Sequence, residues 1–301
     1  MAVTGLHLLL TYECPFECDH CFVWSGPNAR RGTLSISDLR MILREGRKIG
    51  TVKFVYFEGG ESFLYYPVLL KGLRMAREAG FGVGIVTNGY WATTLEDAIE
   101  WLKPLKAIGI QDLSVSDDSL HYGEDEENRA AKAVKAAEAL GLPVSSIAIE
   151  MPKSRKRGPG RKGKPVEGGA LMIKGRAATN LAWKMPKHPW RGFAKCTHED
   201  LENPQRVHID PFGYVQVCQG ISIGNFRETP LSEILRNYKP RDDPIVGLLL
   251  RGGPAALARA YGVPHEPGYV DECHLCYEVR LALREQFHGI LAPDQVYGLF
   301  A

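Results

Sequence analysis

The chain has 301 residues, of which 45% are hydrophobic and 24% are charged, and its formal net charge is +2. This composition excludes a disordered, collagen-like or coiled-coil protein, and the apolar stretches are too short to span a bilayer. No secretory signal precedes the first strand-like run, so we expect a cytoplasmic protein whose seven reduced cysteines serve as metal ligands or catalytic groups.

The positive charge is concentrated in one segment. Residues 151–195 carry 13 Lys and Arg but a single acid, Glu167. Gly and Pro in its densest part, residues 153–164, disfavour a stable helix and predict an exposed flexible loop. The segment is either a solvated linker or a lid and docking arm for an acidic or phosphorylated partner. No aromatic residues interleave with the basic run, which disfavours nucleic acid as the partner.

The first 150 residues alternate strand-like and helix-like patterns. Hydrophobic periodicity predicts strands over residues 6–11, 52–57, 82–87, 113–116 and 144–149, and helices over 35–49, 67–79, 95–102 and 124–140. Ser35 or Ser37 offers a hydroxyl cap for the first helix, and four acids open the last helix at the positive end of its dipole. Strand–helix units in series predict an α/β fold with a parallel sheet, either doubly wound or curved into a barrel. In both cases ligands gather at the carboxyl ends of the strands.

Three cysteines, Cys14, Cys18 and Cys21, follow the first predicted strand. Each thiolate can hold one iron of a cubic [4Fe–4S] cluster, which leaves the fourth iron open to an outside ligand. A zinc ion would need a fourth ligand, and His20, although available, is poorly placed because it is adjacent to Cys21. The spacing therefore favours an iron–sulfur cluster over zinc.

Further motifs follow the next three predicted strands. They are Gly59-Gly60-Glu61, Thr87-Asn88-Gly89 and Ser116-Asp117-Asp118. Together with the Cys-x3-Cys-x2-Cys loop, these motifs resemble the radical S-adenosylmethionine (SAM) superfamily over about residues 5–150. The resemblance implies a [4Fe–4S] cluster whose open iron is chelated by the amino and carboxylate groups of SAM.

The resemblance also implies the cofactor contacts, the fold and the reaction. The Gly-Gly-Glu motif would hold the SAM amino group, the serine and aspartate would pair with the ribose hydroxyls, and a histidine would lie near the adenine. These cofactor-binding roles fall on His20, Gly59, Gly60, Glu61, Asn88, Ser116 and Asp118. The implied fold is a partial (β/α)6-type barrel. The implied reaction is reductive cleavage of SAM to a 5′-deoxyadenosyl radical that abstracts hydrogen from the substrate.

The other four cysteines, Cys196, Cys218, Cys273 and Cys276, lie in the second half of the chain. A β-hairpin is predicted over residues 206–218, and a helix over 277–288. Two separated cysteine pairs fit either a structural zinc or a fully ligated [4Fe–4S] cluster. The arrangement resembles the twitch version of the SPASM domain, although Cys196 lies farther ahead of the hairpin than usual. The resemblance implies a small α+β C-terminal domain with one auxiliary [4Fe–4S] cluster.

We therefore expect three units: a radical SAM core over residues 1–150 with an outer limit near 185, a basic linker or lid over 151–195, and a twitch-like domain over 196–301. The expected function is a radical SAM oxidoreductase or maturase acting on a peptide, a protein or an anionic small molecule. A flavodoxin-like or ferredoxin-like protein is the expected electron donor. The alternative is a non-catalytic iron–sulfur protein that transfers electrons or carries a cofactor.

Several residues of the basic segment have competing interpretations. Arg176 could reach the SAM carboxylate or an anionic substrate, with an ordinary surface arginine as the alternative. Trp183, Trp190 and Phe193 are expected to pack between the domains rather than to line a pocket.

Overall fold

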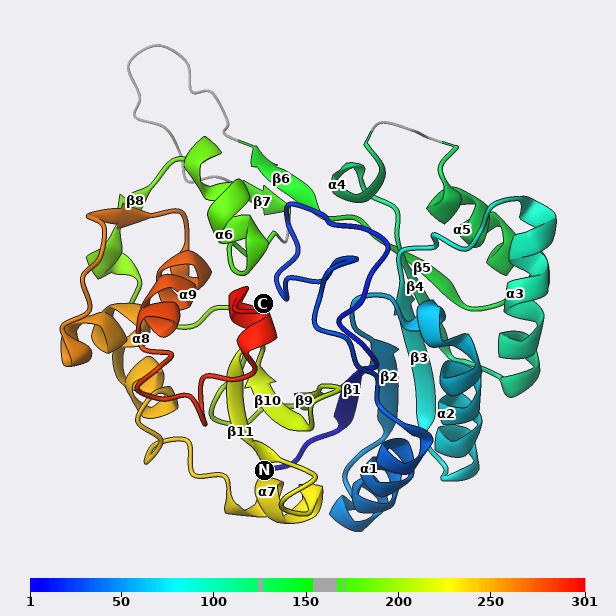
Figure 1. Ribbon diagram of the computed structural model, residues 1–301, viewed down its shortest axis with the longest axis horizontal. Helices are drawn as coiled ribbons and strands as arrows, with labels where there is room; N and C mark the ends of the chain where they lie inside the picture. Colours follow the sequence, from blue (N-terminus) through cyan, green and yellow to red (C-terminus); the bar gives the residue numbers. More distant parts are fainter. Residues whose placement is uncertain (124–126, 154–166, 170, 301) are drawn as a thin grey trace.

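A curved eight-stranded sheet organises the protein (Figure 1). The computed structural model describes residues 1–123, 127–153, 167–169 and 171–300. The strand order is β11-β10-β9-β1-β2-β3-β4-β5, and the strands from β9 to β5 run parallel to their neighbours. The strands of this sheet are β1 (Gly5–Leu9), β2 (Phe54–Glu58), β3 (Gly82–Thr87), β4 (Asp112–Ser116), β5 (Val144–Ile147), β9 (Arg206–Ile209), β10 (Tyr214–Cys218) and β11 (Ile221–Asn225).

Helices cover the outer face of β1–β5, as the strand–helix alternation predicts (Figure 1). They are α1 (Ile36–Ile49), α2 (Tyr66–Glu78), α3 (Leu95–Ile108) and α5 (Arg129–Leu140). Two short helices, η1 (Ser62–Tyr65) and α4 (Ser119–Tyr122), follow the carboxyl ends of β2 and β4. Ser35 caps α1 in a capping box with Asp38, and Gly50 ends the helix in a left-handed conformation. The predicted α/β fold with a mostly parallel sheet is confirmed.

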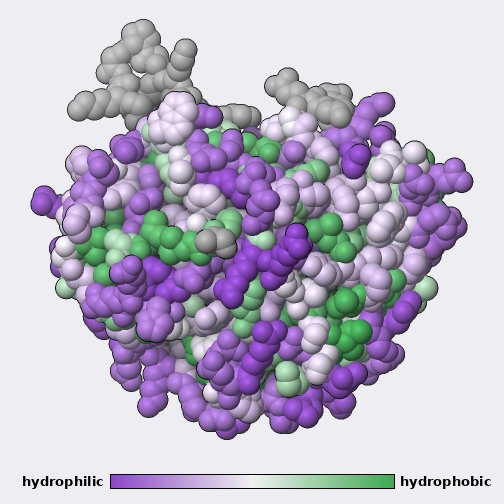
Figure 2. Space-filling view, viewed as in Figure 1, coloured by the Kyte–Doolittle hydropathy of each residue, from purple (hydrophilic) through white to green (hydrophobic). Residues whose placement is uncertain are grey.

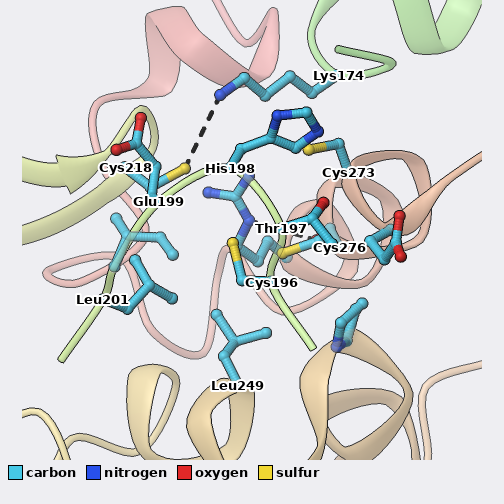
Figure 3. A pocket seen from close by; sticks show the side chains of 14 residues that line it. Lys174, Cys196, Thr197, His198, Glu199, Leu201, Cys218, Leu249, Cys273 and Cys276 are labelled. Atoms are coloured by element: carbon cyan, nitrogen blue, oxygen red, sulfur yellow. Dashed lines mark hydrogen bonds between the residues drawn. The ribbon is translucent and has the colours of Figure 1, made fainter. Parts of the chain in front are cut away.

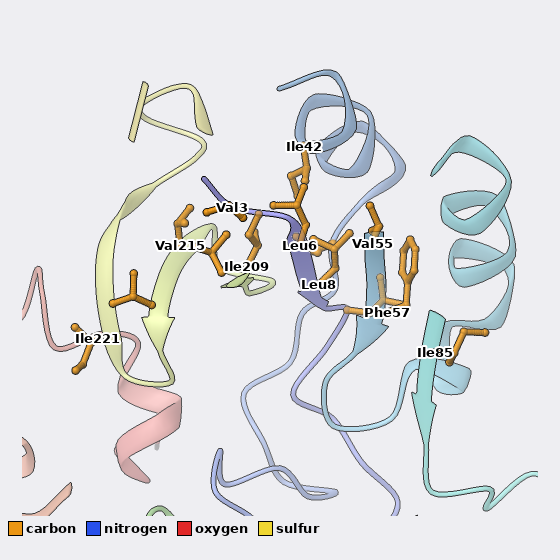
Figure 4. Packing of buried hydrophobic residues seen from close by; sticks show 14 of the residues in the cluster. Val3, Leu6, Leu8, Ile42, Val55, Phe57, Ile85, Ile209, Val215 and Ile221 are labelled. Atoms are coloured by element: carbon orange, nitrogen blue, oxygen red, sulfur yellow. The ribbon is translucent and has the colours of Figure 1, made fainter. Parts of the chain in front are cut away.

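Alternation along β1 separates the core from the concave face of the sheet. Leu6 and Leu8 are fully buried beneath the helices, where Leu6 meets Ile42 of α1 (Figure 4). His7 points to the opposite face and stacks on the Tyr56 ring at a centroid distance of 5.0 Å. The concave face is therefore partly polar, which makes it available for ligands.

The predicted hairpin of the second half extends this same sheet. β9 pairs in parallel with β1, so that His208 lies beside His7, and β10 and β11 continue the sheet in antiparallel fashion. Sequence segments about 200 residues apart thus form neighbouring strands. The domain boundaries at residues 150 and 195 remain a prediction.

Three helices differ by several residues from the sequence prediction. α3 continues to Ile108, six residues beyond its predicted end. α5 begins at Arg129 because Asn128 caps it, with the Asn128 side chain accepting a hydrogen bond from the Ala131 amide. The acidic run therefore precedes the helix instead of forming its first turn, and residues 124–126 lie outside the described part of the chain. α9 (Glu272–Ala282) begins before Cys273, capped by Asp271, and ends six residues earlier than predicted.

The described part of the basic segment packs into the protein. Ile173 and Ala177 belong to the main core, and Lys174 and Arg176 are only 2% and 4% exposed. The alternative that Arg176 is a surface arginine is therefore wrong. The expected packing of Trp183 is also wrong, since this side chain is 73% exposed. The densest basic stretch, residues 154–166, lies outside the described residues. The elements of this segment are β6 (Glu150–Lys153), β7 (Glu167–Gly169), α6 (Arg176–Asn180), η2 (Ala182–Lys184), β8 (His188–Pro189) and η3 (Trp190–Gly192).

In Figure 1 the elements of the protein surround a central region, and the C-terminal elements close this arrangement before the chain ends near its centre. They are α7 (Leu231–Asn237), α8 (Val246–Tyr261), β12 (Gly268–Tyr269), α9 and η4 (Asp294–Tyr297). Gln295 of η4 accepts a hydrogen bond from the Arg30 amide at 2.8 Å and donates one to the Trp24 carbonyl at 2.8 Å. The chain end thereby braces the segment that carries the first three cysteines.

The face of the molecule seen in Figure 2 is mostly polar, with smaller apolar patches between the charged side chains. None of the helices in the described residues combines the length and the apolar character that crossing a bilayer requires.

Candidate functional site

A cavity of about 270 Å³ lies at the carboxyl ends of the parallel strands. Its wall combines the loop after β1 with the ends of β2, β3, β4 and β5, as expected for a parallel α/β sheet. The lining residues that the sequence predicts for the cofactor site are Cys14, Cys18, His20, Cys21, Gly59, Gly60, Asn88 and Ser116. Motifs that are up to 102 positions apart in the sequence thus share one wall.

Hydrogen bonds orient the three-cysteine loop. The Asn88 side-chain amide lies 3.4 Å from the Cys14 sulfur, and the Ser25 amide lies 3.2 Å from the Cys21 sulfur. Arg176 donates from its two terminal nitrogens to the carbonyls of Cys18 and Ser25, each at 2.7 Å. The guanidinium therefore supports the loop from behind. Arg176 does not line the cavity among the described residues, and its direct contact with a ligand remains a prediction.

Gly59 and Gly60 allow the turn after β2 to touch the cysteine loop. A Cβ on Gly60 would stand 2.2 Å from the Glu13 carbonyl oxygen, and one on Gly59 would stand 2.3 Å from that of Thr11. Gly59 also has φ = +142°, which disfavours any side chain. The sequence interpretation placed these glycines against a ligand ammonium. The structure adds a different reason for them, the close approach of two backbones.

Glu61 joins the turns that follow β2 and β3. Its carboxylate accepts hydrogen bonds from the Phe63 amide at 3.0 Å, the Thr87 hydroxyl at 2.9 Å and the Asn88 amide at 2.8 Å. Burial raises the pKa of Glu61 to about 7. Glu61 stands behind the cavity wall and holds Asn88 in place. Its contact with SAM remains a prediction.

His20 presents an unsatisfied buried nitrogen beside the cavity. The side chain is 5% exposed, and its Nδ1 has no hydrogen-bond partner within the described part of the chain. Burial lowers the pKa of His20 to about 4, so the ring is neutral. It packs edge-on against His121 at a centroid distance of 4.4 Å. A buried orphan nitrogen at a cavity wall suits a ligand that offers a hydrogen-bonding partner there.

The Asp118 carboxylate already accepts hydrogen bonds from other residues of the protein. It caps α4 by accepting hydrogen bonds from the Leu120 and His121 amides, and it bonds the Ile149 amide at 3.1 Å. It also holds the His121 ring at 2.9 Å. Ser116 lines the cavity directly, whereas Asp118 acts on it through His121.

The other four cysteines line a second pocket (Figure 3). Cys218 comes from the end of β10, and Cys273 and Cys276 come from the first turn of α9. Cys196 lies on the segment between η3 and β9, and it reaches the pocket despite its unusual spacing. Burial raises the pKa of the Cys276 thiol to about 11 and that of Cys273 well above the ordinary value. Such thiols need a metal to become thiolates.

The spacing of the sulfurs bears on the kind of metal centre. Among the described residues, which include all seven cysteines, the groups of three or more ligand atoms within 4.8 Å of one another contain no cysteine. Four sulfurs around a single zinc ion lie roughly 3.8 Å apart, since each Zn–S bond is about 2.3 Å. A cubic iron–sulfur cluster holds each sulfur on a different iron and therefore requires a wider spacing than zinc does.

Two buried cations accompany the four-cysteine pocket. Lys174 and Arg280 both line it, and they are only 2% and 1% exposed. A thiolate-ligated iron–sulfur cluster carries net negative charge, so buried cations at the wall fit such a group. Sequence reasoning assigned no role to either residue.

Sequence reasoning also missed a polar cluster on the concave face of the sheet. The Glu58 carboxylate lies 3.1 Å from the Nδ1 atoms of both His7 and His208. The Gln219 amide nitrogen lies 3.3 Å from His208 Nε2. Glu58 and Gln219 line the first cavity, and Gln219 follows Cys218 of the second pocket. The contacts depend on the pairing of β9 with β1, and the local sequence carries no signal for them.

A cysteine loop at the end of the first strand faces glycine-rich and polar turns across one cavity of a curved parallel sheet, as the sequence resemblance to radical SAM proteins predicts. Residues 8–153 match the radical SAM superfamily, so this part of the chain is a radical SAM domain. A SAM-binding [4Fe–4S] cluster and SAM are the cofactors that this family implies.

The names of three proteins with similar sequences refer to a peptide or to a cofactor. The chain is 25% identical over 112 residues to a putative peptide biosynthesis protein, YydG, of Bacillus subtilis. It is 27% identical over 157 residues to the tungsten-containing aldehyde ferredoxin oxidoreductase cofactor-modifying protein of Pyrococcus furiosus, and 27% identical over 146 residues to the PqqA peptide cyclase of Streptomyces rochei. These matches cover 37%, 48% and 48% of this chain and only 35%, 42% and 40% of the relatives.

Solved structures support the fold. BtrN in complex with AdoMet and 2-DOIA superposes with a TM-score of 0.50 at 16% identity, over 79% of this chain and 83% of that one. The structure of anSMEcpe with bound AdoMet gives a TM-score of 0.52 at 12% identity, over 95% of this chain and 97% of that one. At these identities the likeness concerns the fold alone.

Proposed function

We propose that this protein is a radical SAM oxidoreductase or maturase with one auxiliary [4Fe–4S] cluster in a twitch-like C-terminal region. The observation that carries the proposal is the division of all seven cysteines between two cavities, three in one and four in the other. Three ligands suit a cluster with one open iron, and four ligands suit a cluster that is fully coordinated.

The residues of the first cavity would bind and orient SAM. Cys14, Cys18 and Cys21 would hold the cluster, and when bound this group supplies the electron that cleaves SAM to methionine and a 5′-deoxyadenosyl radical. The neutral His20 would offer its free nitrogen to the ligand, and Ser116 its hydroxyl. Phe16, Phe22, Val23, Ile147 and Ile149 form apolar parts of the wall that exclude water from the reacting groups.

The four-cysteine pocket would serve electron transfer. Full protein ligation leaves no open iron for substrate, so the auxiliary group would exchange electrons rather than bind the reacting molecule. This arrangement supports a net oxidation, with a flavodoxin-like or ferredoxin-like protein as the external donor. We propose a peptide or an anionic small molecule as substrate, and two of the similar proteins named above are a putative peptide biosynthesis protein and a peptide cyclase.

Anaerobic reconstitution tests this proposal. The parent protein should bind about eight irons per chain, and Cys218→Ala should bind about four while it still forms 5′-deoxyadenosine from SAM and dithionite. The variant Cys14→Ala/Cys18→Ala/Cys21→Ala should keep about four irons and form no 5′-deoxyadenosine.

Three outcomes would contradict parts of the proposal. A parent protein that forms no 5′-deoxyadenosine under any reductant would be a non-catalytic iron–sulfur protein. Four irons plus one zinc per chain would exclude the auxiliary cluster. A Cys218→Ala variant that retained both clusters would show that Cys218 is not a ligand.

A further inference from the structure

Lys174 lies between the two cysteine sites and contacts both. Its ammonium donates to the Gln219 side-chain oxygen at 2.7 Å. The ammonium lies 3.9 Å from the Cys218 sulfur, a contact drawn in Figure 3. It also stands over the Phe22 ring, 5.2 Å from the centroid, and Phe22 directly follows Cys21. One cation thus touches a ligand of the four-cysteine pocket and two residues of the SAM cavity wall.

Burial makes the charge on Lys174 significant. The side chain is only 2% exposed, and a buried ammonium requires a nearby negative charge. Among the described residues, no ion pair joins Lys174 to a carboxylate. Its partners are a neutral amide, an aromatic ring and a cysteine sulfur, so the thiolates and the proposed auxiliary cluster would supply the balancing negative charge.

Arg280 is the other buried cation at this pocket, but its hydrogen bonds face elsewhere. It donates to the backbone carbonyl of Gln219 at 3.0 Å and to that of Cys276 at 3.3 Å. Its guanidinium therefore braces the backbone of α9 and of the turn after β10. Lys174 has the direct contact with a ligand sulfur.

We propose that Lys174 raises the reduction potential of the auxiliary cluster. It is a positioning residue that acts through Cys218 and stabilises the reduced form of the cluster. This inference rests on the proposed function, because it requires that cluster. Reduction adds one negative charge to the group, and a fixed cation within hydrogen-bonding distance of a ligand sulfur favours the more negative state. Low solvent exposure strengthens the effect, since water cannot screen the charge.

Redox titration monitored by electron paramagnetic resonance tests the inference without a substrate. The full chain carrying Cys14→Ala/Cys18→Ala/Cys21→Ala isolates the auxiliary cluster, and its midpoint potential is compared with and without Lys174→Met. We expect the neutral side chain to lower the ratio of reduced to oxidised cluster at a fixed potential at least about tenfold, which is about 59 mV for a one-electron couple. Lys174→Arg, which keeps the charge, should stay near the parent potential.

Lys184→Met is the matched control. It removes a lysine that stands over the exposed Trp183 ring and lines neither cysteine site, so the potential should not change. Equal potentials for Lys174→Met and Lys184→Met would overturn the inference. If Lys174→Met fails to assemble the cluster, Lys174→Gln replaces it in the same comparison, because it keeps a hydrogen-bond donor without the charge.

The design separates this inference from the proposed function. If the triple cysteine variant holds no [4Fe–4S] cluster, the auxiliary cluster itself is wrong. If the cluster is present and its midpoint potential is the same with and without the charge at position 174, only the role of Lys174 is wrong.

Discussion

Gly60→Ala is the most direct test of how the first cavity is built. The added Cβ would meet three backbone atoms of the cysteine loop: the Glu13 carbonyl oxygen at 2.2 Å, the Tyr12 carbonyl oxygen at 2.6 Å and the Glu13 carbonyl carbon at 2.7 Å. Backbone atoms cannot rotate away as a flexible side chain can. The loop must therefore retreat by roughly 1.3 Å to reach the ~3.5 Å of ordinary contact.

The retreat breaks identifiable interactions. The Gly60 amide donates to the Thr11 carbonyl at 2.7 Å, and the Glu61 amide donates to the Glu13 carbonyl at 2.9 Å. Losing both hydrogen bonds costs about 2 kcal/mol, and overpacking adds about 1–3 kcal/mol. A total of about 3–5 kcal/mol corresponds to a decrease of roughly 5–8 °C in Tm for a chain of this size. Because Cys14 follows Glu13 directly, the SAM-site cluster should also be lost.

Differential scanning calorimetry and iron analysis of the anaerobically reconstituted protein measure both effects. Gly289→Ala is the control, since nothing lies within 4 Å of its added Cβ and its φ is not positive. We expect Gly60→Ala to lose about four irons per chain and the control to lose none. A Gly60→Ala protein with the parent Tm and full iron content would refute the close backbone approach on which this reasoning depends.

Two further substitutions probe the scaffold. Ser35→Ala removes the side-chain acceptor of the α1 capping box and should lower the free energy of unfolding in urea by about 1 kcal/mol, whereas exposed Ser37→Ala should leave it unchanged; equal effects would contradict the cap assignment. Asp210 is fully buried, and burial raises its pKa from 3.8 to about 7, so its stabilising contribution is complete below about pH 4 and is lost as the pH rises through 7. Asp210→Asn cannot titrate, so its free energy of unfolding should fall less between pH 5 and pH 8 than that of the parent, and parallel curves would refute the shifted pKa.

The elements with strong local signals were predictable from the sequence. β3 has the predicted bounds, and α1 differs by one residue because its cap and its glycine stop are local features. The start of α5 was misplaced because Asn128 provides a local cap that the acidic run obscured. The length of α9 was also misjudged, since apolar periodicity continues beyond the point where the helix ends.

The arrangement of some predicted cofactor residues also followed from the sequence, whereas that of others did not. The three cysteines, Gly59 and Gly60 meet at one cavity because the ends of parallel strands converge, a consequence that topology alone predicts. Glu61 and Asp118 carry the expected motifs, yet the protein uses their carboxylates as hydrogen-bond acceptors for its own backbone. Sequence spacing cannot show this difference, because it depends on which amide groups fold back onto each carboxylate.

The sequence by itself determined the class of fold and the number of cysteines available to each site, because strand–helix periodicity and short ligand spacings are local properties. Only the tertiary structure decided that the second half continues the sheet through the pairing of β9 with β1, and that Lys174 and Arg176 are buried beside the cysteines. The physical reason is the range of the contacts. A basic run in a sequence predicts solvated surface. Long-range packing can bury individual charged side chains of that run and bring them into contact with distant residues, which the local sequence does not show.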